Sequence, residues 1–325
     1  MYSAEELKDL VEKSLKGMQY AEGPQELFSP VIYSLSVGGK RIRPILSLLS
    51  CNLFTDRITD RCVLPSAGLE VFHCFTLVHD DIMDNADMRR NQPVVHKKWN
   101  VNTAILSGDA MCIEAYKLLC GAASDKLSGV LNAFNKAAIK VCEGQQYDMN
   151  YEGKITITED DYLKMIELKT AALIAVSTKI GAIVGGASSA DIERLTKLGM
   201  NLGMAFQIQD DIMDTYSDSK KLGKDVGLDI ANNKKTYLLT SAIRLAKGEQ
   251  KKQLTSLIST QNIPFEEKFK QIKEIYDDLK VKELAEAKVK EYFAIVESEL
   301  NAVEIKPERK IFLKEFINNL FLRQN

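Results

Sequence analysis

Apolar residues recur at helical spacing along almost the whole chain. One apolar stripe runs through residues 64–78 and a second through residues 195–212, with apolar side chains three or four positions apart. No convincing run of alternating apolar and polar residues between hairpin turns indicates paired strands. Only seven prolines interrupt the 325 residues, so long helices meet few breaks. The pattern predicts an all-α protein with many helices of moderate length.

Short polar or glycine-containing stretches separate the predicted helices. Gly38 and Gly39 form one break, and residues 85–93 form a polar end to the first stripe. We expect a loop at residues 150–161, with Thr158 as the N-cap of the next helix. Further polar connections are expected at residues 217–233 and 248–264. None of them is a Pro/Ser-rich linker, so the sequence predicts one domain over residues 1–325, although the length alone would allow two.

Charge and composition exclude several other classes of protein. The formal net charge is −2, and no basic excess or basic tail favours nucleic acid or a membrane surface as partner. We expect no transmembrane segment, and the first residues lack the pattern of a signal peptide. The six cysteines form no CxxC pair and no zinc spacing. They suit the reducing cytoplasm, and we interpret them as small buried apolar residues.

The five-residue sequence DDIMD occurs twice, at residues 80–84 and 210–214, each time at the end of an apolar stripe. On a helix, Asp80 and Asp84 lie one turn apart on one face, as do Asp210 and Asp214. Like charges at this spacing repel each other unless a cation lies between them. Carboxylate oxygens favour Mg²⁺ over Zn²⁺, and Mg²⁺ completes its shell with water and phosphates. A single copy is as often a solvated helix end, whereas two identical copies favour metal binding.

Cations lie close to both carboxylate motifs in the sequence. GGKRIRP at residues 38–44 places three cations beside two glycines, whose backbone N–H groups can approach a phosphate closely. Arg89 and Arg90 follow the first DDIMD copy. Each cation alone is typical of a solvated surface, and for Lys235 that alternative is the better one. Together they predict a cavity in which metal binds one diphosphate, arginines bind another, and apolar helix faces enclose a hydrocarbon tail.

These motifs resemble those of the trans-isoprenyl diphosphate synthases, the polyprenyl synthetase family. Six motifs stand in the family's order between residues 38 and 237: GGKRIRP, DDIMD with RR, GQ at residues 144–145, KT at residues 169–170, FQIQDDIMD and GKDVGLD. The resemblance implies the isoprenoid synthase fold, with helices around a central catalytic cavity. Many members have Gly after the arginine pair, where this chain has Asn91. Because Asn tolerates positive φ, we expect the turn to be kept.

The resemblance implies a head-to-tail prenyltransferase and a role for each matched residue. Asp80, Asp84 and Asp210 would bind three Mg²⁺ ions, supported by Asp214 and Asp81. The implied ligands of the allylic diphosphate are Arg89, Lys169 and Lys224; those of isopentenyl diphosphate are Lys40, Arg43, His73 and Arg90; Thr170 and Gln207 would face the carbocation, and Lys234 would lie near the site. Without the surrounding motif, His73 would be interpreted as a hydrogen-bonded core histidine.

Product length is expected to depend on two phenylalanines of the first stripe. Phe75 and Phe72 precede Asp80 by five and eight residues, which is roughly 7.5 Å and 12 Å along a helix axis. In the family, an aromatic residue at the fifth upstream position resembles short-chain members, so the implied product is farnesyl or geranylgeranyl diphosphate. The alternative is that both rings are ordinary core residues.

Two alternatives to a prenyltransferase remain open. A class I terpene cyclase shares a first DDxxD and an all-α fold, but usually carries a different second motif and lacks GGKRIRP. A non-catalytic regulatory subunit typically loses an aspartate motif, and this chain keeps both. The resemblance also implies a homodimer. Residues 217–235, and with less support Arg323, are candidates for a lid that keeps water from the cation.

Overall fold

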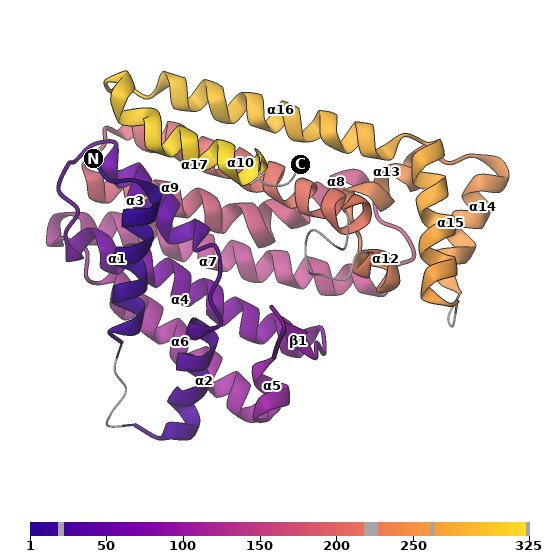
Figure 1. Ribbon diagram of the computed structural model, residues 1–325, viewed down its shortest axis with the longest axis horizontal. Helices are drawn as coiled ribbons and strands as arrows, with labels where there is room; N and C mark the ends of the chain where they lie inside the picture. The colour runs from indigo at the N-terminus through magenta and orange to yellow at the C-terminus, as the bar shows by residue number, and fades with distance from the viewer. Residues whose placement is uncertain (19–22, 218–226, 261–262, 323–325) are drawn as a thin grey trace. The chain divides into compact units, whose positions relative to one another are not determined.

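The structure is a computed structural model that describes residues 1–18, 23–217, 227–260 and 263–322 (Figure 1). The described residues are almost entirely helical, so the predicted all-α class is confirmed. Their only sheet is an antiparallel hairpin of two short strands, β1 (Met88–Arg89) and β2 (Gln92–Pro93). Strands of two residues are too short to show the alternation by which strands are recognised in a sequence.

The helices form two compact units. Unit one comprises residues 1–135, 176–195 and 303–318, and unit two comprises residues 136–175, 196–302 and 319–325. That they form a single domain stays a prediction. The helices wholly in unit one are α1 (Ala4–Lys16), α2 (Gln25–Ser36), α3 (Ile42–Asn52), α4 (Asp60–Met83), α5 (Val95–Lys98), α6 (Val101–Leu119) and the 3₁₀ turn η2 (Pro307–Lys310).

Unit two contains most of the shorter helices of the second half of the chain. Wholly within it are α8 (Glu159–Ile166), the π-helical turn η1 (Glu167–Ala171), α12 (Leu228–Ala231), α13 (Tyr237–Leu245), α14 (Gly248–Ser259), α15 (Phe265–Asp278) and α16 (Val281–Ala302). Four helices have residues in both units: α7 (Ser124–Glu152), α9 (Ala172–Gly185), α10 (Ser189–Tyr216) and α17 (Ile311–Leu322).

The two predicted apolar stripes lie on α4 and α10. The α4 stripe is buried at Ala67, Val71, Phe72 and Val78, and the α10 stripe at Leu195, Leu198, Leu202, Ala205 and Ile212. α4 packs along α6 in unit one. A Cβ on Gly68 of α4 would lie 2.9 Å from the carbonyl oxygen of Ala115 on α6. The missing side chain therefore lets these two helices approach closely.

Three stretches expected as connections are partly helical, and one of them, residues 217–233, contains α12. α7 continues to Glu152, so the loop before α8 is shorter than predicted. Thr158 caps α8 as predicted and forms a capping box with Asp161. The expected connection at residues 248–264 contains α14. This helix is mostly polar, and its narrow apolar face consists of three buried residues, Leu254, Leu257 and Ile258. The helical pattern is therefore weak in the sequence.

All six cysteines have free thiols, but the expectation that all are buried is wrong for half of them. Cys51, Cys62 and Cys74 are buried, and Cys112 is half-buried. Cys120, which caps α6, and Cys142, on α7, are exposed. Composition alone cannot say which side of a helix a cysteine occupies.

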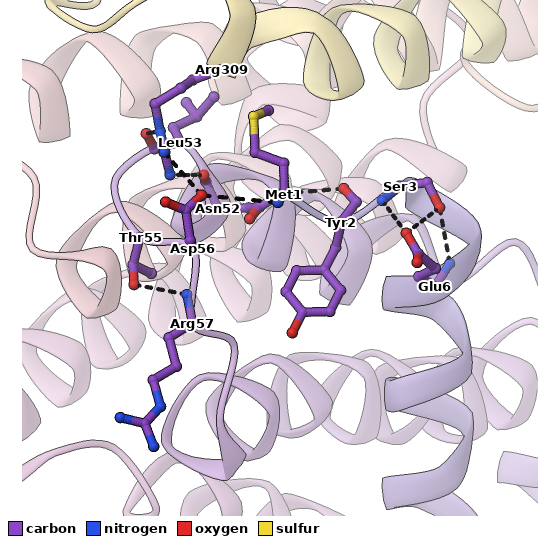
Figure 2. Close-up of polar contacts among 10 residues, drawn as sticks. All are labelled: Met1, Tyr2, Ser3, Glu6, Asn52, Leu53, Thr55, Asp56, Arg57 and Arg309. Carbon is purple, nitrogen blue, oxygen red and sulfur yellow. Dashed lines mark hydrogen bonds and ion pairs between the residues drawn. The ribbon is translucent and has the colours of Figure 1, made fainter.

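Arg309 joins segments of unit one that are far apart in the sequence (Figure 2). Its guanidinium donates to the carbonyl oxygens of Asn52 and Leu53 at the end of α3, and pairs with Asp56 at 3.0 Å. The amide of Asn52 donates to the carbonyl oxygen of Tyr2 at 3.2 Å. Hydrogen bonds therefore connect η2, the end of α3 and the first residues of the chain.

Among the described residues, two helical segments, 60–83 and 159–185, are long and apolar enough to cross a membrane by length and composition alone. In each, 67% of the apolar window is buried inside the protein. Such burial is typical of core helices, so neither segment is strong evidence for a membrane span.

Candidate active site

The first carboxylate motif ends α4 in unit one. Asp80 is half-buried and Asp84, at the C-cap, is exposed. Asp81 between them is buried, accepts a hydrogen bond from the Nε of Arg89 at 2.8 Å and forms an ion pair with its Nη2, also at 2.8 Å. Burial raises the pKa of Asp81 to about 6, while the charge of Arg89 works against this increase. Asp81 is therefore an anchor for Arg89, which leaves Asp80 and Asp84 as the more accessible carboxylates.

The hairpin after α4 orients the arginine pair. Arg90 and Asn91 are the two central residues of the turn between β1 and β2, with φ of 52° and 60°. Positive φ at both positions is typical of a tight hairpin turn, so the expectation for Asn91 is confirmed. Arg90 donates to the carbonyl oxygen of Gly38, and a Cβ on Gly39 would lie 2.6 Å from its Nη1. The glycine pair thus leaves room for this guanidinium.

Arg43 and His73 belong to the same cationic cluster of unit one. The Nε of Arg43 is buried and has no hydrogen-bond partner in the structure. Burial, and then the charges of Arg43, Arg90 and Arg89, hold the pKa of His73 well below its usual range. Several positive charges around a neutral imidazole and an unused buried donor form a site suited to an anion. Lys40, the remaining predicted cation of this group, is exposed.

Arg41, although part of GGKRIRP, is a structural residue. It is buried, pairs with Glu12 at 2.8 Å and Glu70 at 2.9 Å, and donates to the carbonyl oxygen of Leu35 at 2.6 Å. Burial alone would lower the pKa of Arg41, but the two carboxylates raise it overall. Each of its three side-chain nitrogens donates within unit one, and the side chain is almost fully buried, so it is not available to a ligand.

The second carboxylate motif lies on α10 in unit two. Its middle carboxylate, Asp211, is buried and accepts from the Tyr162 hydroxyl at 2.5 Å, the Tyr237 N–H at 2.7 Å and the Gln207 amide at 3.3 Å. Burial raises the pKa of Asp211 to about 7, although these donors lower it. Asp211, like Asp81, is held by its own unit.

The outer carboxylates of this motif are close to a further one, Asp229. The Asp229 N–H donates to the carboxylate of Asp214 at 3.0 Å. Burial, and then the charges of Asp211, Asp214 and Asp210, raise the pKa of Asp229 well above its usual range. A concentration of negative charge that raises a carboxyl pKa is an environment that a divalent cation would relieve.

Residues 24–279 match the polyprenyl synthetase family. The geranylgeranyl diphosphate synthase of Sulfolobus acidocaldarius is 39% identical over 246 residues, which cover 74% of each chain. The geranylfarnesyl diphosphate synthase of Natronomonas pharaonis is 35% identical over 254 residues, covering 73% of this chain and 74% of its own. The crystal structure of a geranylgeranyl pyrophosphate synthase matches 100% of both chains, with a TM-score of 0.94 and 36% identity.

The chain belongs to the polyprenyl synthetase family. It is a trans-isoprenyl diphosphate synthase, which condenses isopentenyl diphosphate with allylic diphosphates, and it has the isoprenoid synthase fold. These relatives are named as synthases, which favours neither a terpene cyclase nor a non-catalytic subunit. Retention of both DDIMD copies agrees with an enzyme.

The KT motif of this synthase lies in the π-helical turn η1, where the chain is tightly packed. A Cβ on Gly144 of α7 would lie 2.2 Å from the backbone nitrogen of Lys169, and a Cβ on Gly203 of α10 would lie 2.5 Å from the Cα of Ala171. The two glycines therefore let α7 and α10 pass on either side of the turn. π-helical turns inside α-helices are frequent at functional sites.

Within unit two, the structure brings several predicted residues of the synthase together. Thr170 donates to the side-chain oxygen of Gln207 at 3.0 Å, and Lys169 pairs with Asp148 at 2.5 Å. Lys234 pairs with Glu152 at 3.6 Å. Lys224 and Arg323 lie outside the described residues, as do residues 218–226 of the expected lid.

Sequence reasoning missed two residues of this group. Asp148 positions Lys169, and its signal was available, because it lies one helical turn after Gly144 of the GQ motif. Asp229 closes the GKDVGLD motif, which was recognised without giving its last residue a role.

Proposed function

We propose that this synthase binds the allylic diphosphate through Mg²⁺ held by the outer aspartates of both DDIMD copies. The observation that supports this most strongly is their shared arrangement. In each copy the middle aspartate is buried and hydrogen-bonded, whereas the outer pair is more accessible. Asp80, Asp84, Asp210 and Asp214 are the proposed ligands of three ions, with Lys169 and Lys224 as further ligands of the diphosphate.

The residues present fit Mg²⁺ better than a metal that needs a closed cage. Across the parts of the chain that the structure describes, no three His, Cys, Asp or Glu side chains form a ready-made metal site. Mg²⁺ requires fewer protein ligands, because it is commonly held by one or two carboxylates together with water and phosphates. When bound, it would supply the positive charge that stabilises a departing diphosphate.

The proposed site for isopentenyl diphosphate is the cationic cluster of unit one. Arg43, Arg90 and Lys40 would bind the phosphates, and the unused Nε donor of Arg43 would gain an acceptor. His73 is neutral when the cluster is empty, and nearby phosphate would raise its pKa. Arg89 and Arg90 also line a largely apolar pocket with Leu77 and Val78, which suits a five-carbon tail.

The proposed reaction breaks the allylic C–O bond, and the electron pair leaves with the diphosphate. The double bond of isopentenyl diphosphate then attacks the allylic cation and forms the new C–C bond. The resulting cation loses a proton to the released diphosphate, so no protein base is required. The oxygens of Thr170 and Gln207 would stabilise the cation, and Asp211 fixes the Gln207 amide.

The proposal is tested by assaying diphosphate release from dimethylallyl, geranyl and farnesyl diphosphate, with and without isopentenyl diphosphate. We expect release that requires both isopentenyl diphosphate and Mg²⁺, and that stops when EDTA removes the metal. Release without isopentenyl diphosphate would indicate a cyclase or a hydrolase, and no release from any primer would indicate a non-catalytic subunit.

Arg90→Lys is expected to raise the KM for isopentenyl diphosphate more than that for the allylic substrate. Lysine keeps the charge but loses the planar fork that binds two phosphate oxygens at once. Steady-state kinetics with each substrate varied in turn measure both constants. Lys169→Met is the matched comparison, because it should affect mainly the allylic constant. Equal changes in both constants for Arg90→Lys would place Arg90 elsewhere.

For the product we propose geranylgeranyl diphosphate, with the rings of α4 as the floor of the tunnel. Phe75 is half-buried and contacts Phe72 at a centroid distance of 5.3 Å. Phe72 is buried and packs on Phe134 at a centroid distance of 4.9 Å, so it either supports the ring of Phe75 or is an ordinary core residue. The names of the relatives, geranylgeranyl and geranylfarnesyl synthases, support a chain of this length.

Phe75→Ala is expected to shift the product to longer chains, because it removes the first bulky side chain below the carboxylates. The stability cost would be about 3 kcal/mol for a packed ring. Chromatography of dephosphorylated products from both proteins gives the chain lengths. Phe134→Leu alters the same aromatic cluster from α7 and should leave product length unchanged. A folded Phe75→Ala enzyme with wild-type products would show that Phe75 is not the floor.

We also propose that the synthase is a cytoplasmic homodimer that pairs through α6. This helix exposes large apolar side chains, among them Ile105, Leu106, Ile113 and Tyr116. An exposed apolar face of this kind is typical of a surface covered by another subunit. The six free thiols agree with a reducing compartment. Sedimentation equilibrium of the wild type and of Ile113→Asp, which should dissociate the dimer, tests the pairing.

A further inference from the structure

Unit two contains a pocket of about 450 Å³, distinct from the pocket beside Arg89 and Arg90 in unit one. None of the predicted active-site residues is among its lining residues. It lies where the turn after α12 meets the end of α14 and the start of α15. Ile258 and Phe265 provide apolar walls, and Ser259 and Thr260 provide hydroxyl groups. A volume of this size lies within the range of small-molecule sites, and the lining is more polar than apolar.

The pocket contains a buried cation without a counter-charge. Lys268, on α15, is only 6% exposed. Its ammonium donates to the carbonyl oxygen of Ala231 at 3.2 Å, although an ammonium group has three donors. Burial lowers the pKa of Lys268, and no carboxylate of the described residues forms an ion pair with its ammonium. An uncompensated buried charge costs free energy, which a bound anion would recover.

Asn233 adds an unused acceptor to the same pocket. Its Oδ1 is buried and has no hydrogen-bond partner. The backbone around it is fixed, because a second buried lysine, Lys235, donates to the Asn233 carbonyl oxygen at 3.0 Å. Ser259 donates its own proton to the carbonyl oxygen of Thr255 at 2.7 Å. The pocket thus offers an ammonium donor for an anionic oxygen and an amide oxygen for a hydroxyl group.

We propose that this pocket binds a small phosphate-bearing molecule that also carries a hydroxyl group. Lys268 is the ligand of the phosphate, and the Oδ1 of Asn233 accepts from the hydroxyl. Hydrogen phosphate meets both requirements through its P–O⁻ and P–OH groups, and a phosphate monoester of a polyol meets them with separate atoms. Charge-assisted hydrogen bonds of this kind are among the strongest that a protein offers.

The experiment follows the methyl groups of Ile258 and Ile263, which both line the pocket. Full-length protein with labelled isoleucine methyls is titrated with inorganic phosphate and with glycerol 3-phosphate, in EDTA and at constant ionic strength. We expect saturable shifts of both methyl resonances with a Kd of about 1 mM or tighter. Ile113, on α6 in unit one, is the internal control and should not shift.

Two variants decide the outcome. Lys268→Met should abolish the shifts and should unfold at a higher temperature than the wild type without phosphate, because it removes an uncompensated charge. Asn233→Asp places a negative charge in the pocket with Lys268 and should also abolish the methyl shifts. Arg90→Met weakens the proposed diphosphate site of unit one and should leave them unchanged. Shifts that persist in either pocket variant, or unmoved Ile258 and Ile263 in the wild type, would overturn the proposal.

Tighter binding of glycerol 3-phosphate than of phosphate would identify an organic phosphate as the ligand, and equal binding would identify the free anion. None of these measurements uses catalysis, so they are independent of the function proposed for the carboxylate motifs.

Discussion

Asp80→Ala is expected to lower the turnover of the synthase about thousandfold, which corresponds to about 4 kcal/mol of transition-state stabilisation. Asp80 lies at the end of α4, one turn before Asp84, and neither side chain is fully buried. Loss of one carboxylate of this pair removes a proposed ligand of the Mg²⁺ that would neutralise the departing diphosphate. The fold should remain intact, because a repelling charge is removed from the helix end.

The measurement is the rate of diphosphate release at saturating Mg²⁺, together with thermal unfolding of both proteins. Asp87→Ala is a matched control, because Asp87 follows the same motif but is exposed and pairs with the surface residue Lys97 at 2.9 Å. It should keep wild-type turnover. Near-normal activity of Asp80→Ala in Mg²⁺ would contradict the assignment of this carboxylate to the metal.

The helical architecture could be predicted because its causes are local. The apolar stripe on α4 could be recognised from residues three and four positions apart, and the N-cap at Thr158 could be recognised from the helix that it begins. The Arg90–Asn91 turn also followed from one residue, since Asn tolerates the positive φ that the turn needs. The α14 helix was missed because a weak local signal, three buried apolar residues in a polar segment, depended on tertiary packing.

The roles within the candidate site could be predicted only in part, since charged residues of one type serve different purposes. GGKRIRP contains three cations that differ in the structure. Lys40 is exposed, Arg41 is a buried structural residue, and the Nε of Arg43 is a buried donor without a hydrogen-bond partner. The middle aspartates Asp81 and Asp211 differ from their neighbours in their partners, which include Arg89 on β1 and Tyr162 on α8. Spacing identifies which residues can share a face, but not which of them is buried.

Arg41→Met is expected to destabilise the protein by about 3–5 kcal/mol, because it leaves the carboxylate of Glu70 buried without its partner. Glu70 is 2% exposed, and Arg41 pairs with it at 2.9 Å. The substitution also removes the donor to the Leu35 carbonyl oxygen at the end of α2. Methionine keeps much of the volume, so the loss reflects the charge more than a cavity. Urea unfolding followed by circular dichroism gives the difference.

Two further variants separate the buried ion pair from the general effect of losing a cation. Lys40→Met removes the neighbouring charge, which is exposed, and should change the free energy of unfolding by less than about 0.5 kcal/mol. The double variant Arg41→Met with Glu70→Gln leaves no unpaired charge at the buried position, while the carboxylate of Glu12 is partly exposed to solvent, so the variant should recover most of the lost stability. If Arg41→Met is no more destabilising than Lys40→Met, or if the second substitution recovers nothing, then Glu70 does not depend on Arg41. Arg41 would in that case be available to a ligand, like the other cations of its motif.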